Sequence, residues 1–360
     1  MRIAQVAPLI ERVPPACYGG TERVVSYLTE ELVARGHAVT LFASGDSVTR
    51  ARLVPGWEQN LRLGKPATDP VAVHMGMLLG VYERAKEFDV IHCHTDYLGL
   101  PLSRTVSVPT VLTLHGRLDI PEIHPVYQRF PNVHLVSISD AQRAPLTGVR
   151  WAATIHHGLS PDMYRFHAHG GRHLLFLGRI SPEKCPDAAI RVAIRAGVPL
   201  RIAAKVDAPN QEYFEQVVRP MLDHPLVEFL GEVDDARKEE LLADALAFVF
   251  PIDWPEPFGI VLIEALACGT PIIARRRGSI PEIVTHGETG FVCDDEDEMV
   301  AAIGRVGEIS RAACRASFEQ RFAVETMTDA YLRLYERARG APRETIRVLP
   351  TPRTAPTLSA

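Results

Sequence analysis

The feature that most constrains the fold is a repeated alternation of short apolar runs with segments of helical periodicity. The first unit contains an apolar run at 2–8, a glycine-containing loop at 11–20, a helical pattern that stops at Gly36, and a second apolar run at 39–43. A strand, a helix and a second strand in this order imply a right-handed crossover in a parallel sheet. The sequence therefore predicts an α/β protein with helices on both faces of its sheets.

The length and the strand pattern predict two domains. A chain of 360 residues can bury two separate cores. We expect one domain at 1–160 and a second at 161–323, because a new series of strands begins near residue 173. A final helix is expected at about 324–339. The tail at 340–360 is rich in Pro, Thr and Arg, and is predicted to be disordered.

Three further segments complete the expected layout. The segment 44–69 is polar and is predicted to be irregular, whereas apolar spacing predicts helices at 71–88 and 210–222.

Composition and charge exclude several classes of function. The chain is 46% hydrophobic and 23% charged, as is usual for globular proteins, and its net charge of −5 gives no reason to expect nucleic acid as a partner. The sequence has no apolar run of membrane-spanning length and no signal-peptide pattern at its start, so we expect no transmembrane segment and a cytoplasmic location. The six cysteines form no C-x-x-C pair and the histidines lack the H-E-x-x-H spacing. We therefore expect free thiols, no metal site and no bound cofactor.

The stretch at 250–275 carries the clearest site chemistry. An apolar run leads into a proline-rich loop that holds Glu256, and Gly259 then opens a helical segment that holds Glu264. The free amides of a helix start can receive an anion, and carboxylates accept hydrogen bonds from sugar hydroxyls. The pattern indicates a site for a sugar bearing a phosphate group. For Glu264 alone, a helix-end charge or a buried ion pair explains the residue equally well.

Cationic and glycine residues stand at the ends of other predicted strands. Arg179 and Lys184 flank a strand-to-helix loop and suit a diphosphate, although a solvated loop also carries such residues. Gly19 and Gly20 precede a helix whose amides can face an anion. No G-x-G-x-x-G follows the first strand, which makes a dehydrogenase the least favoured enzyme class.

Two histidines and a serine also follow predicted strands. His115 can donate to an oxygen or orient a phosphate, and His94 has the same potential, but a strand-end histidine is more often structural. Ser139 suits a cap for the helix that follows it. Ligands of open parallel sheets bind beyond the carboxyl ends of the strands, so these groups from both halves predict a cleft between the domains.

At this point the sequence resembles a known family. The run Glu256-Pro257-Phe258-Gly259 through Glu264 resembles the E-x7-E motif of retaining glycosyltransferases of family 4. The segment 178–184 is similar to the second signature of that family, and 18–22 is similar to its glycine loop. Further similarities lie at 113–116, 278–283 and 287–291. The resemblance covers residues 1 to about 339.

This resemblance implies a fold, a reaction and substrates. It implies the GT-B fold, with two Rossmann-like domains facing across a cleft and the final helix crossing back to the first domain. It implies a nucleotide-diphosphate-sugar donor, such as a UDP- or GDP-sugar, with retention at the anomeric carbon and no obligatory metal. The acceptor, a small molecule, a glycan or a lipid-linked group, stays open.

The resemblance also assigns roles by position. Arg179 and Lys184 would hold the diphosphate, Glu256 the sugar hydroxyls and Glu264 the ribose, with His115 near the reacting sugar. These residues, without Glu264, form the expected catalytic set. The expected donor-binding set contains Glu264 together with Gly19, Gly20, Glu232, Val233, Phe258, Gly259, Ile260 and Val261. His94 and Ser139 are expected on the acceptor side.

Two positions depart from the family pattern, and two other functions stay open. Cys185 stands where the family often has Gly, and His157-Gly158 replaces the common Asn-Gly. One alternative is a nucleotide-sugar epimerase on the same fold. The other is a non-catalytic protein that binds a nucleotide sugar.

Overall fold

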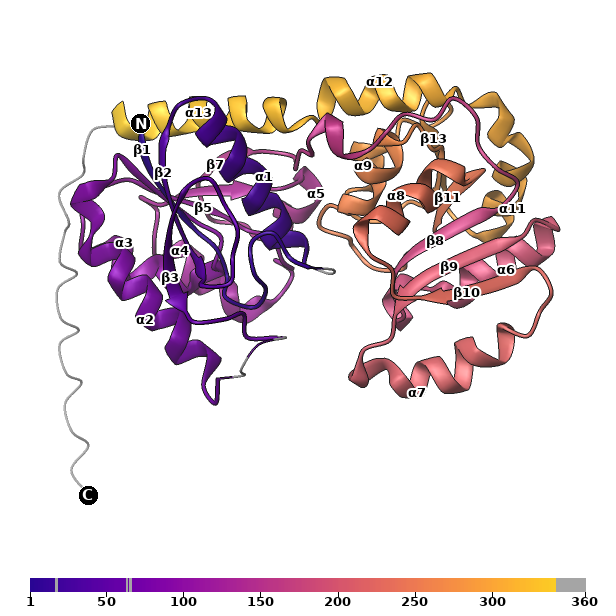
Figure 1. The fold of residues 1–360 in the computed structure, drawn as a ribbon, viewed down its shortest axis with the longest axis horizontal. Helices are drawn as coiled ribbons and strands as arrows, with labels where there is room; N and C mark the ends of the chain where they lie inside the picture. Colours follow the sequence, from indigo (N-terminus) through magenta and orange to yellow (C-terminus); the bar gives the residue numbers. More distant parts are fainter. Residues whose placement is uncertain (17–18, 63, 65–66, 341–360) are drawn as a thin grey trace.

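The computed structural model describes residues 1–16, 19–62, 64 and 67–340. The chain forms two lobes that lie side by side, and its last helix runs along one side of the first lobe after the chain has left the second (Figure 1). Each lobe is built on one parallel sheet, which confirms the predicted α/β class.

Among the described residues, the first sheet has seven parallel strands in the order β3-β2-β1-β4-β5-β6-β7. Their bounds are β1 Arg2–Val6, β2 Ala38–Ser44, β3 Arg52–Trp57, β4 Val90–Cys93, β5 Thr110–Thr113, β6 His134–Ser137 and β7 Trp151–Thr154. The helices of this lobe are α1 Gly20–Ala34, α2 Pro70–Glu83, α3 Leu100–Ser103, α4 His124–Gln128 and α5 Asp140–Arg143.

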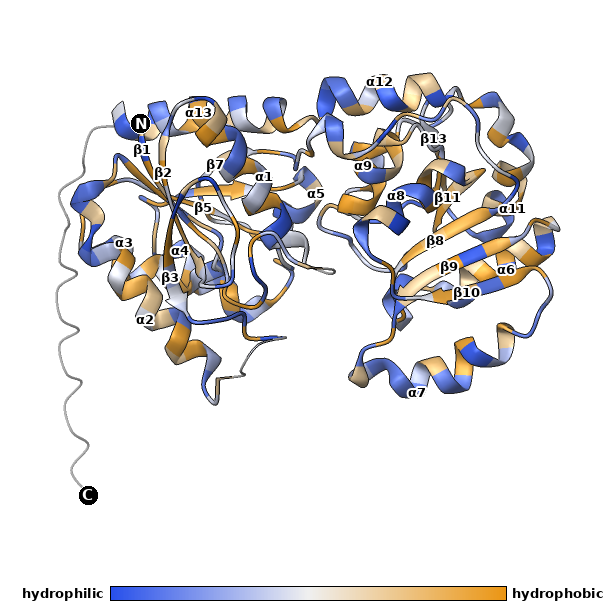
Figure 2. Ribbon diagram, viewed as in Figure 1, coloured by the Kyte–Doolittle hydropathy of each residue, from blue (hydrophilic) through white to orange (hydrophobic). Residues whose placement is uncertain are grey.

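The second sheet has six parallel strands in the described part of the chain, in the order β10-β9-β8-β11-β12-β13. Their bounds are β8 Leu174–Arg179, β9 Leu200–Lys205, β10 Val227–Gly231, β11 Ala247–Phe250, β12 Ile272–Arg275 and β13 Gly290–Cys293. The helices are α6 Pro186–Ala196, α7 Gln211–Tyr213, α8 Asp235–Asp244, α9 Ile260–Ala267, α10 Ile280–Ile283, α11 Glu296–Arg305 and α12 Arg311–Arg321. Apolar residues concentrate on the strands, and the helices show one polar face (Figure 2).

The last helix, α13 Val324–Gly340, packs on the first lobe. Its buried residues Met327, Tyr331 and Leu334 share one apolar cluster with Ile3 of β1 and Leu28 of α1. The chain thus leaves the second lobe and returns to the first, as the resemblance implied. The domain limits 1–160 and 161–323 stay predictions. The predicted tail lies outside the described residues from 341 onward.

Three expected segments differ from the structure. The segment 44–69 contains strand β3, whose partly exposed residues include Pro55 and Gly56, so its sequence lacks a strand pattern. The helix expected at 71–88 ends at Glu83 and is followed by a 3₁₀ turn. The helix expected at 210–222 divides into α7, a π-helical turn and a 3₁₀ turn, because Pro220 has no amide proton to continue a regular helix.

No helix in the described part of the chain is both long and apolar enough to cross a membrane. Cys93, Cys185, Cys268, Cys293 and Cys314 are free thiols, as expected. Cys17 lies outside the described residues.

Candidate active site

Arg179 lies at the carboxyl end of β8, directly before the loop that leads to α6. One of its terminal nitrogens lies 3.4 Å from Glu183 Oε1. Its Nε is buried and has no hydrogen-bond partner among the described residues. Lys205, at the end of neighbouring β9, is its partner in the register of the sheet. This edge of the sheet therefore presents two cations at adjacent strand ends.

Lys184 and Glu256 form an ion pair that joins two loops of the second lobe. The Nζ atom lies 2.5 Å from Glu256 Oε2, and both side chains are about one-eighth exposed. Trp254 donates its indole N–H to the same oxygen at 2.7 Å, and Lys184 also lies over the Trp254 ring. Lys184, which is predicted to bind the diphosphate, and Glu256, which is predicted to bind the sugar, are therefore in direct contact.

The loop that holds Glu256 packs directly against the backbone of Gly278 and Ser279. Gly278 has a φ of 51°, and a Cβ placed on it would lie 2.4 Å from the Glu256 backbone nitrogen. Ser279 donates its amide to the Glu256 carbonyl at 3.0 Å and its hydroxyl to the Phe258 carbonyl at 2.7 Å. The glycine is required because the two backbones pass so closely, and the serine fixes both ends of the loop.

Helix α9 begins directly after this loop and faces the first lobe. Gly259 precedes it in a left-handed conformation, with a φ of 86°. The amides of Ile260 and Val261 are the first two of the helix, and no described residue accepts from them. Gly20, at the start of α1, lies across the cleft, where an added Cβ would stand 3.3 Å from Ile260 Cδ1. The two helix starts therefore approach each other, with a free set of amides between them.

Glu264 lies in α9 and is almost fully buried. Its Oε1 accepts from the Tyr164 hydroxyl at 2.8 Å and from Lys238 Nζ at 2.7 Å. Lys238 also pairs with Asp235, which Arg23 of α1 reaches across the cleft at 2.7 Å. Burial and the nearby negative charge of Glu264 raise the pKa of the Tyr164 hydroxyl. Glu264 therefore belongs to a charged cluster that links the two lobes.

His115 lies just beyond β5 and is enclosed by two other histidines. Its Nε2 lies 2.9 Å from Nδ1 of His94, and its ring stacks on His157 at 5.2 Å between centroids. Phe258 of the second lobe contacts the His157 ring in a T-shaped arrangement, with 4.8 Å between ring centroids. Burial lowers the pKa of His115 to about 3, and it lowers the pKa of His94 and of His157 well below 6.5. All three rings are neutral at physiological pH, so they act through hydrogen bonds and not through charge.

Ser139 and Glu282 join the lobes at the base of the cleft. Ser139 caps α5 by accepting the Gln142 amide at 2.9 Å, and donates to the Pro257 carbonyl at 2.6 Å. Glu282 accepts the amides of Asp140 and Ala141 at 2.8 and 2.7 Å. Ser139 and His94 are buried and satisfied within the protein, so the structure gives neither a surface toward an acceptor.

The remaining expected residues lie at the edge strand and in the loops. Gly231 ends β10 at the sheet edge with a φ of 72°, exposed Glu232 follows it, and Val233 packs on the core. Cys185 has a φ of 52°, a left-handed conformation, which explains why a glycine suits this position in the family pattern. Gly158 is likewise constrained, because an added Cβ would lie 2.6 Å from the Ala323 carbonyl oxygen.

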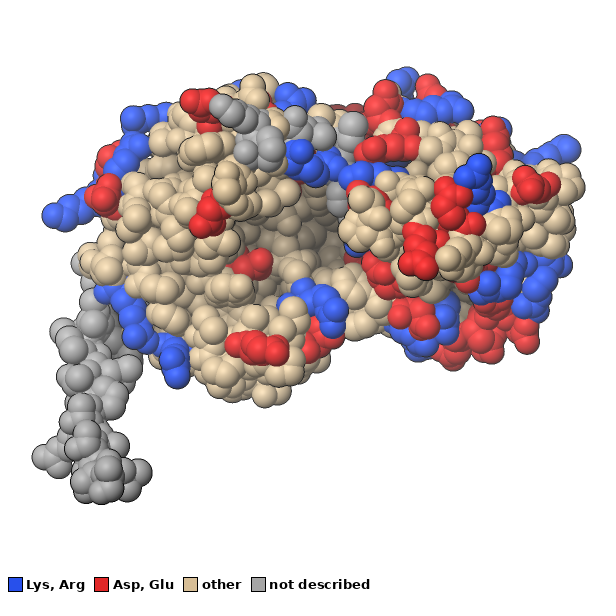
Figure 3. All heavy atoms as spheres, turned by 90° about the horizontal axis from the view of Figure 1, so that it is seen from below, with Lys and Arg blue, Asp and Glu red and all other residues tan. Residues whose placement is uncertain are grey.

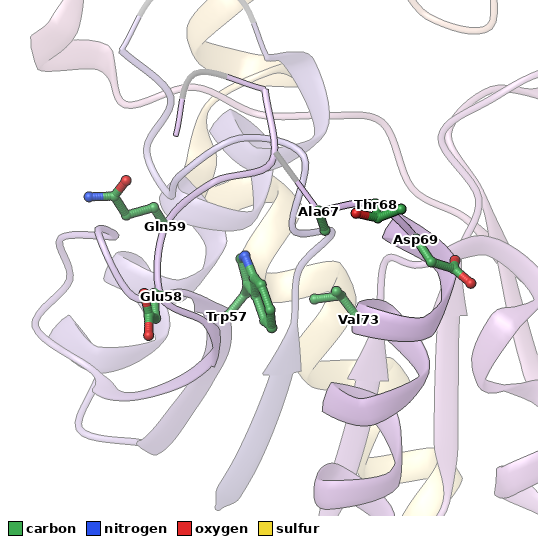
Figure 4. A pocket seen from close by; sticks show the side chains of 7 residues that line it. All are labelled: Trp57, Glu58, Gln59, Ala67, Thr68, Asp69 and Val73. Atoms are coloured by element: carbon green, nitrogen blue, oxygen red, sulfur yellow. The ribbon is translucent and has the colours of Figure 1, made fainter. Parts of the chain in front are cut away.

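A cavity of about 410 Å³ lies beside the end of β3 and the start of α2 and contains none of the residues above. Trp57 and Val73 face each other in its wall, and Thr68 and Asp69 lie at its margin (Figure 4). Between the lobes the molecular surface is hollowed. The visible wall of this hollow on the first lobe is largely uncharged, whereas charged side chains cover the second lobe (Figure 3).

Sequence reasoning missed several residues that the structure brings to the cleft. These are Arg23, Tyr164, Lys205, Asp235 and Lys238. Only Lys205 carries a usable signal, since it directly follows the apolar run at 200–204, which predicts a strand. No group of three or more His, Cys, Asp or Glu side chains in the described ranges is arranged to hold a metal ion.

Comparisons with known proteins match both halves of the chain. The family model described as Glycosyltransferase Family 4 matches residues 18–138, and the one described as Glycosyl transferases group 1 matches residues 166–316. This chain is a family 4 glycosyltransferase with the GT-B fold.

Individual relatives agree with this assignment of a glycosyltransferase. A glycogen synthase of Mycobacterium tuberculosis is 27% identical, with 92% of this chain and 94% of the relative covered. A phosphatidyl-myo-inositol mannosyltransferase of Mycolicibacterium smegmatis is also 27% identical, with 95% of each chain covered. The solved structure of AviGT4, a glycosyltransferase involved in avilamycin A biosynthesis, is 25% identical with a TM-score of 0.72, covering 95% of this chain and 99% of that one.

Proposed function

We propose that this glycosyltransferase moves a hexose-type sugar from a UDP- or GDP-sugar to an acceptor hydroxyl, with retention and without a metal. Three features of the cleft support this proposal most strongly. They are Arg179 at the end of β8, the Lys184–Glu256 ion pair, and the start of α9 opposite Gly20. The roles of these residues rest on their positions and chemistry.

The diphosphate of the donor would bind where positive charge and free amides meet. The buried Nε of Arg179 has no hydrogen-bond partner in the described part of the chain, and Lys184 is a cation in the same loop region. The amides of Ile260 and Val261 at the start of α9 add further donors for phosphate oxygens. Together these groups supply the positive charge that a metal ion supplies in other transferases.

The sugar and the ribose would bind on the two carboxylates. Glu256 stands beside the proposed diphosphate site and accepts hydrogen bonds from sugar hydroxyls once Lys184 turns to the phosphate. The two described bonds of Glu264 both end on Oε1, which leaves Oε2 for a ribose hydroxyl. The base would lie at the edge of the sheet near Glu232 and Val233.

The proposed chemical step is a displacement on one face of the sugar. The bond between the anomeric carbon and the leaving phosphate oxygen breaks, and the acceptor oxygen bonds to the same face of that carbon. The acceptor proton passes to the leaving phosphate oxygen, so a glycoside and a nucleoside diphosphate result. Fixed cations and amides that meet the charge developing on the leaving group supply the largest part of such catalysis.

The acceptor would enter from the first lobe. Two segments of this lobe are candidates for the contact: 117–129, where Arg117 lies over the Trp254 ring of the second lobe, and 44–69, which supplies most of the lining of the cavity beside Trp57. The relatives named above differ in the acceptors that their names state, and we infer that contacts of the first lobe make this choice.

A panel of UDP- and GDP-sugars tests the proposal. Slow hydrolysis of one donor, followed by NMR, would identify the sugar and show whether its anomeric configuration is retained. We expect Arg179→Ala to abolish hydrolysis. Arg305→Ala is the control and should leave hydrolysis unchanged, because Arg305 is an exposed residue of α11 that pairs with Glu308. Absence of hydrolysis for every donor, an inverted product, or a trapped glycosyl-enzyme adduct would each refute part of the mechanism.

A further inference from the structure

A continuous chain of buried hydrogen bonds leads from His115 at the cleft to helix α13. His115 Nε2 lies 2.9 Å from His94 Nδ1, and His94 Nε2 lies 3.0 Å from Gln5 Oε1. Gln5 Nε2 donates to the Tyr335 hydroxyl at 3.2 Å. The chain then passes from Tyr335 to His92 at 2.6 Å, from His92 to Thr113 at 2.8 Å and from Thr113 to Tyr331 at 2.9 Å.

Stability alone does not account for these polar groups. Every member except His115 is 2% exposed or less, and they lie between β1, β4, β5 and α13, where apolar side chains would pack without any need for partners. Buried polar networks fix one arrangement of their donors and acceptors. The single member that reaches the cleft is His115, which is partly exposed. The network therefore ends at a group that a substrate can contact.

The amide of Gln5 sets the direction of the bonds on the His115 side. Its oxygen, which only accepts, faces His94, and its nitrogen, which only donates, faces Tyr335. His94 must therefore carry its proton on Nε2. Because burial keeps His94 neutral, its Nδ1 has no proton and must accept from His115. His115 is then protonated on Nε2, and its Nδ1 is a bare nitrogen.

We propose that Gln5 and His94 are positioning residues that hold His115 in this tautomer, so that Nδ1 accepts a hydrogen bond from a hydroxyl of the transferred sugar. This inference rests on the proposed function, because it places the sugar beside His115. No described residue forms a hydrogen bond with Nδ1, which leaves it available to a ligand in the cleft. A nitrogen that can only accept a hydrogen bond favours a hydroxyl at this point. It disfavours a carbonyl or a phosphate oxygen, because neither of these donates a hydrogen bond.

The direct test is ¹⁵N NMR of histidine in the full-length protein, which distinguishes a protonated from a bare ring nitrogen without any substrate. We expect Nε2–H and bare Nδ1 for His115 in the wild type. In Gln5→Met the Nε2–H of His94 loses its acceptor, so the His94–His115 bond should reverse and move the His115 proton to Nδ1. We expect kcat to fall by about tenfold with little change in KM for the donor.

Two further variants separate positioning from packing. In Gln5→Glu, a protonated carboxyl accepts from His94 and donates to Tyr335 as the amide does, so the tautomer and kcat should be restored. Tyr331→Phe removes one equally buried hydrogen bond on the far side of Gln5, and should leave the His115 tautomer and kcat as in the wild type. If Gln5→Met and Tyr331→Phe behave alike, or if the wild-type His115 carries its proton on Nδ1, the proposal is wrong.

Donors that each lack one hydroxyl identify the group that Nδ1 accepts. Loss of that hydroxyl should slow the wild type by about tenfold and leave Gln5→Met unaffected. If no hydroxyl shows this coupling, the contact with the sugar is refuted even where the tautomer is confirmed. Failure of every nucleotide sugar to react would instead refute the proposed function, because the NMR result does not depend on turnover.

Discussion

Lys184 and Glu256 are bound to each other in the cleft, with Nζ 2.5 Å from Oε2. The pair joins the loop after β8 to the loop before α9, and it is reinforced by the Trp254 indole. A cation and a carboxylate that are expected to bind different parts of one donor therefore neutralise each other until that donor arrives. The donor diphosphate would compete for the cation and release the carboxylate to the sugar.

Replacing Lys184 tests the catalytic half of this pair. We expect Lys184→Ala to lower kcat/KM by about 10²–10³, because one fixed cation facing the leaving diphosphate is lost. Steady-state transfer rates measure the effect. Lys86→Ala is the matched control. Lys86 is exposed in the turn before β4, at the end of the first sheet where the strand begins and not at the carboxyl end that faces the cleft. An equal loss in both variants, or none in Lys184→Ala, would contradict the assignment.

Replacing Glu256 should separate the diphosphate from the sugar. Glu256→Gln keeps an oxygen for the Trp254 indole but removes the charge that holds Lys184. The affinity for the nucleoside diphosphate alone should stay equal or rise, while transfer falls by about 10². Calorimetric titration and transfer assays on the same preparation measure the two quantities. A fall in diphosphate affinity that matches the fall in transfer would show that Glu256 does not act on the sugar.

Glu282 is expected to hold the lobes together. Its carboxylate accepts two amides of the first lobe and lies 3.2 Å from His156 Nε2. The His156 side chain and the two backbone amides stabilise the ionised carboxylate, so they lower the pKa of Glu282 although it is partly buried. We expect Glu282→Gln to reduce the free energy of unfolding by about 1–3 kcal/mol in a denaturant titration. Glu288→Gln, at an exposed position of the next loop, should have no such effect.

Acid should destabilise the protein through its buried histidines. Burial lowers the pKa of His92, His94, His115 and His157, so below about 6.5 the unfolded chain binds protons that the folded protein does not. The free energy of unfolding should therefore fall with pH below that value, by up to about 1.4 kcal/mol per pH unit for each histidine. Urea titrations at several pH values measure the slope. His157→Asn should make it shallower; an unchanged slope would show that His157 is not part of it.

The left-handed backbone at Cys185 predicts an unusual order of variants. A side chain in this conformation costs roughly 1–2 kcal/mol, and a β-branched one fits it worst. Cys185→Gly should change the stability by no more than about 1 kcal/mol, because relief of strain offsets the added freedom of the unfolded chain. Cys185→Val should be clearly destabilising. Thermal unfolding of both variants decides the matter, and the reverse order would contradict the conformation.

The fold was largely predictable because most of its strands are apolar runs that alternate with segments of helical periodicity. Strand β3 was not, since an edge strand with Pro55 and Gly56 and partly exposed side chains lacks the pattern. The signature loops around Glu256 and Arg179 were also recognisable, because their residue types and spacing carry the chemistry.

Other parts of the site depend on contacts that sequence spacing does not reveal. Gln5 meets Tyr335 across 330 positions of the chain, and Arg23 meets Asp235 across 212. Ser139 and His94 were expected to face an acceptor, but their side chains are buried and bonded within the protein. Ser139 bonds to Pro257 of the second lobe and His94 to Gln5 of another strand, and no local sequence pattern describes either contact.

The central claim is that the cleft binds a nucleotide-diphosphate sugar through Arg179 and Lys184. Calorimetric titration of UDP- and GDP-sugars into the wild type, Arg179→Ala and Arg305→Ala tests it most directly. We predict saturable binding of one donor class to the wild type and to Arg305→Ala, and a loss of at least about tenfold in affinity for Arg179→Ala. Binding of no donor, or equal binding by all three proteins, would contradict it.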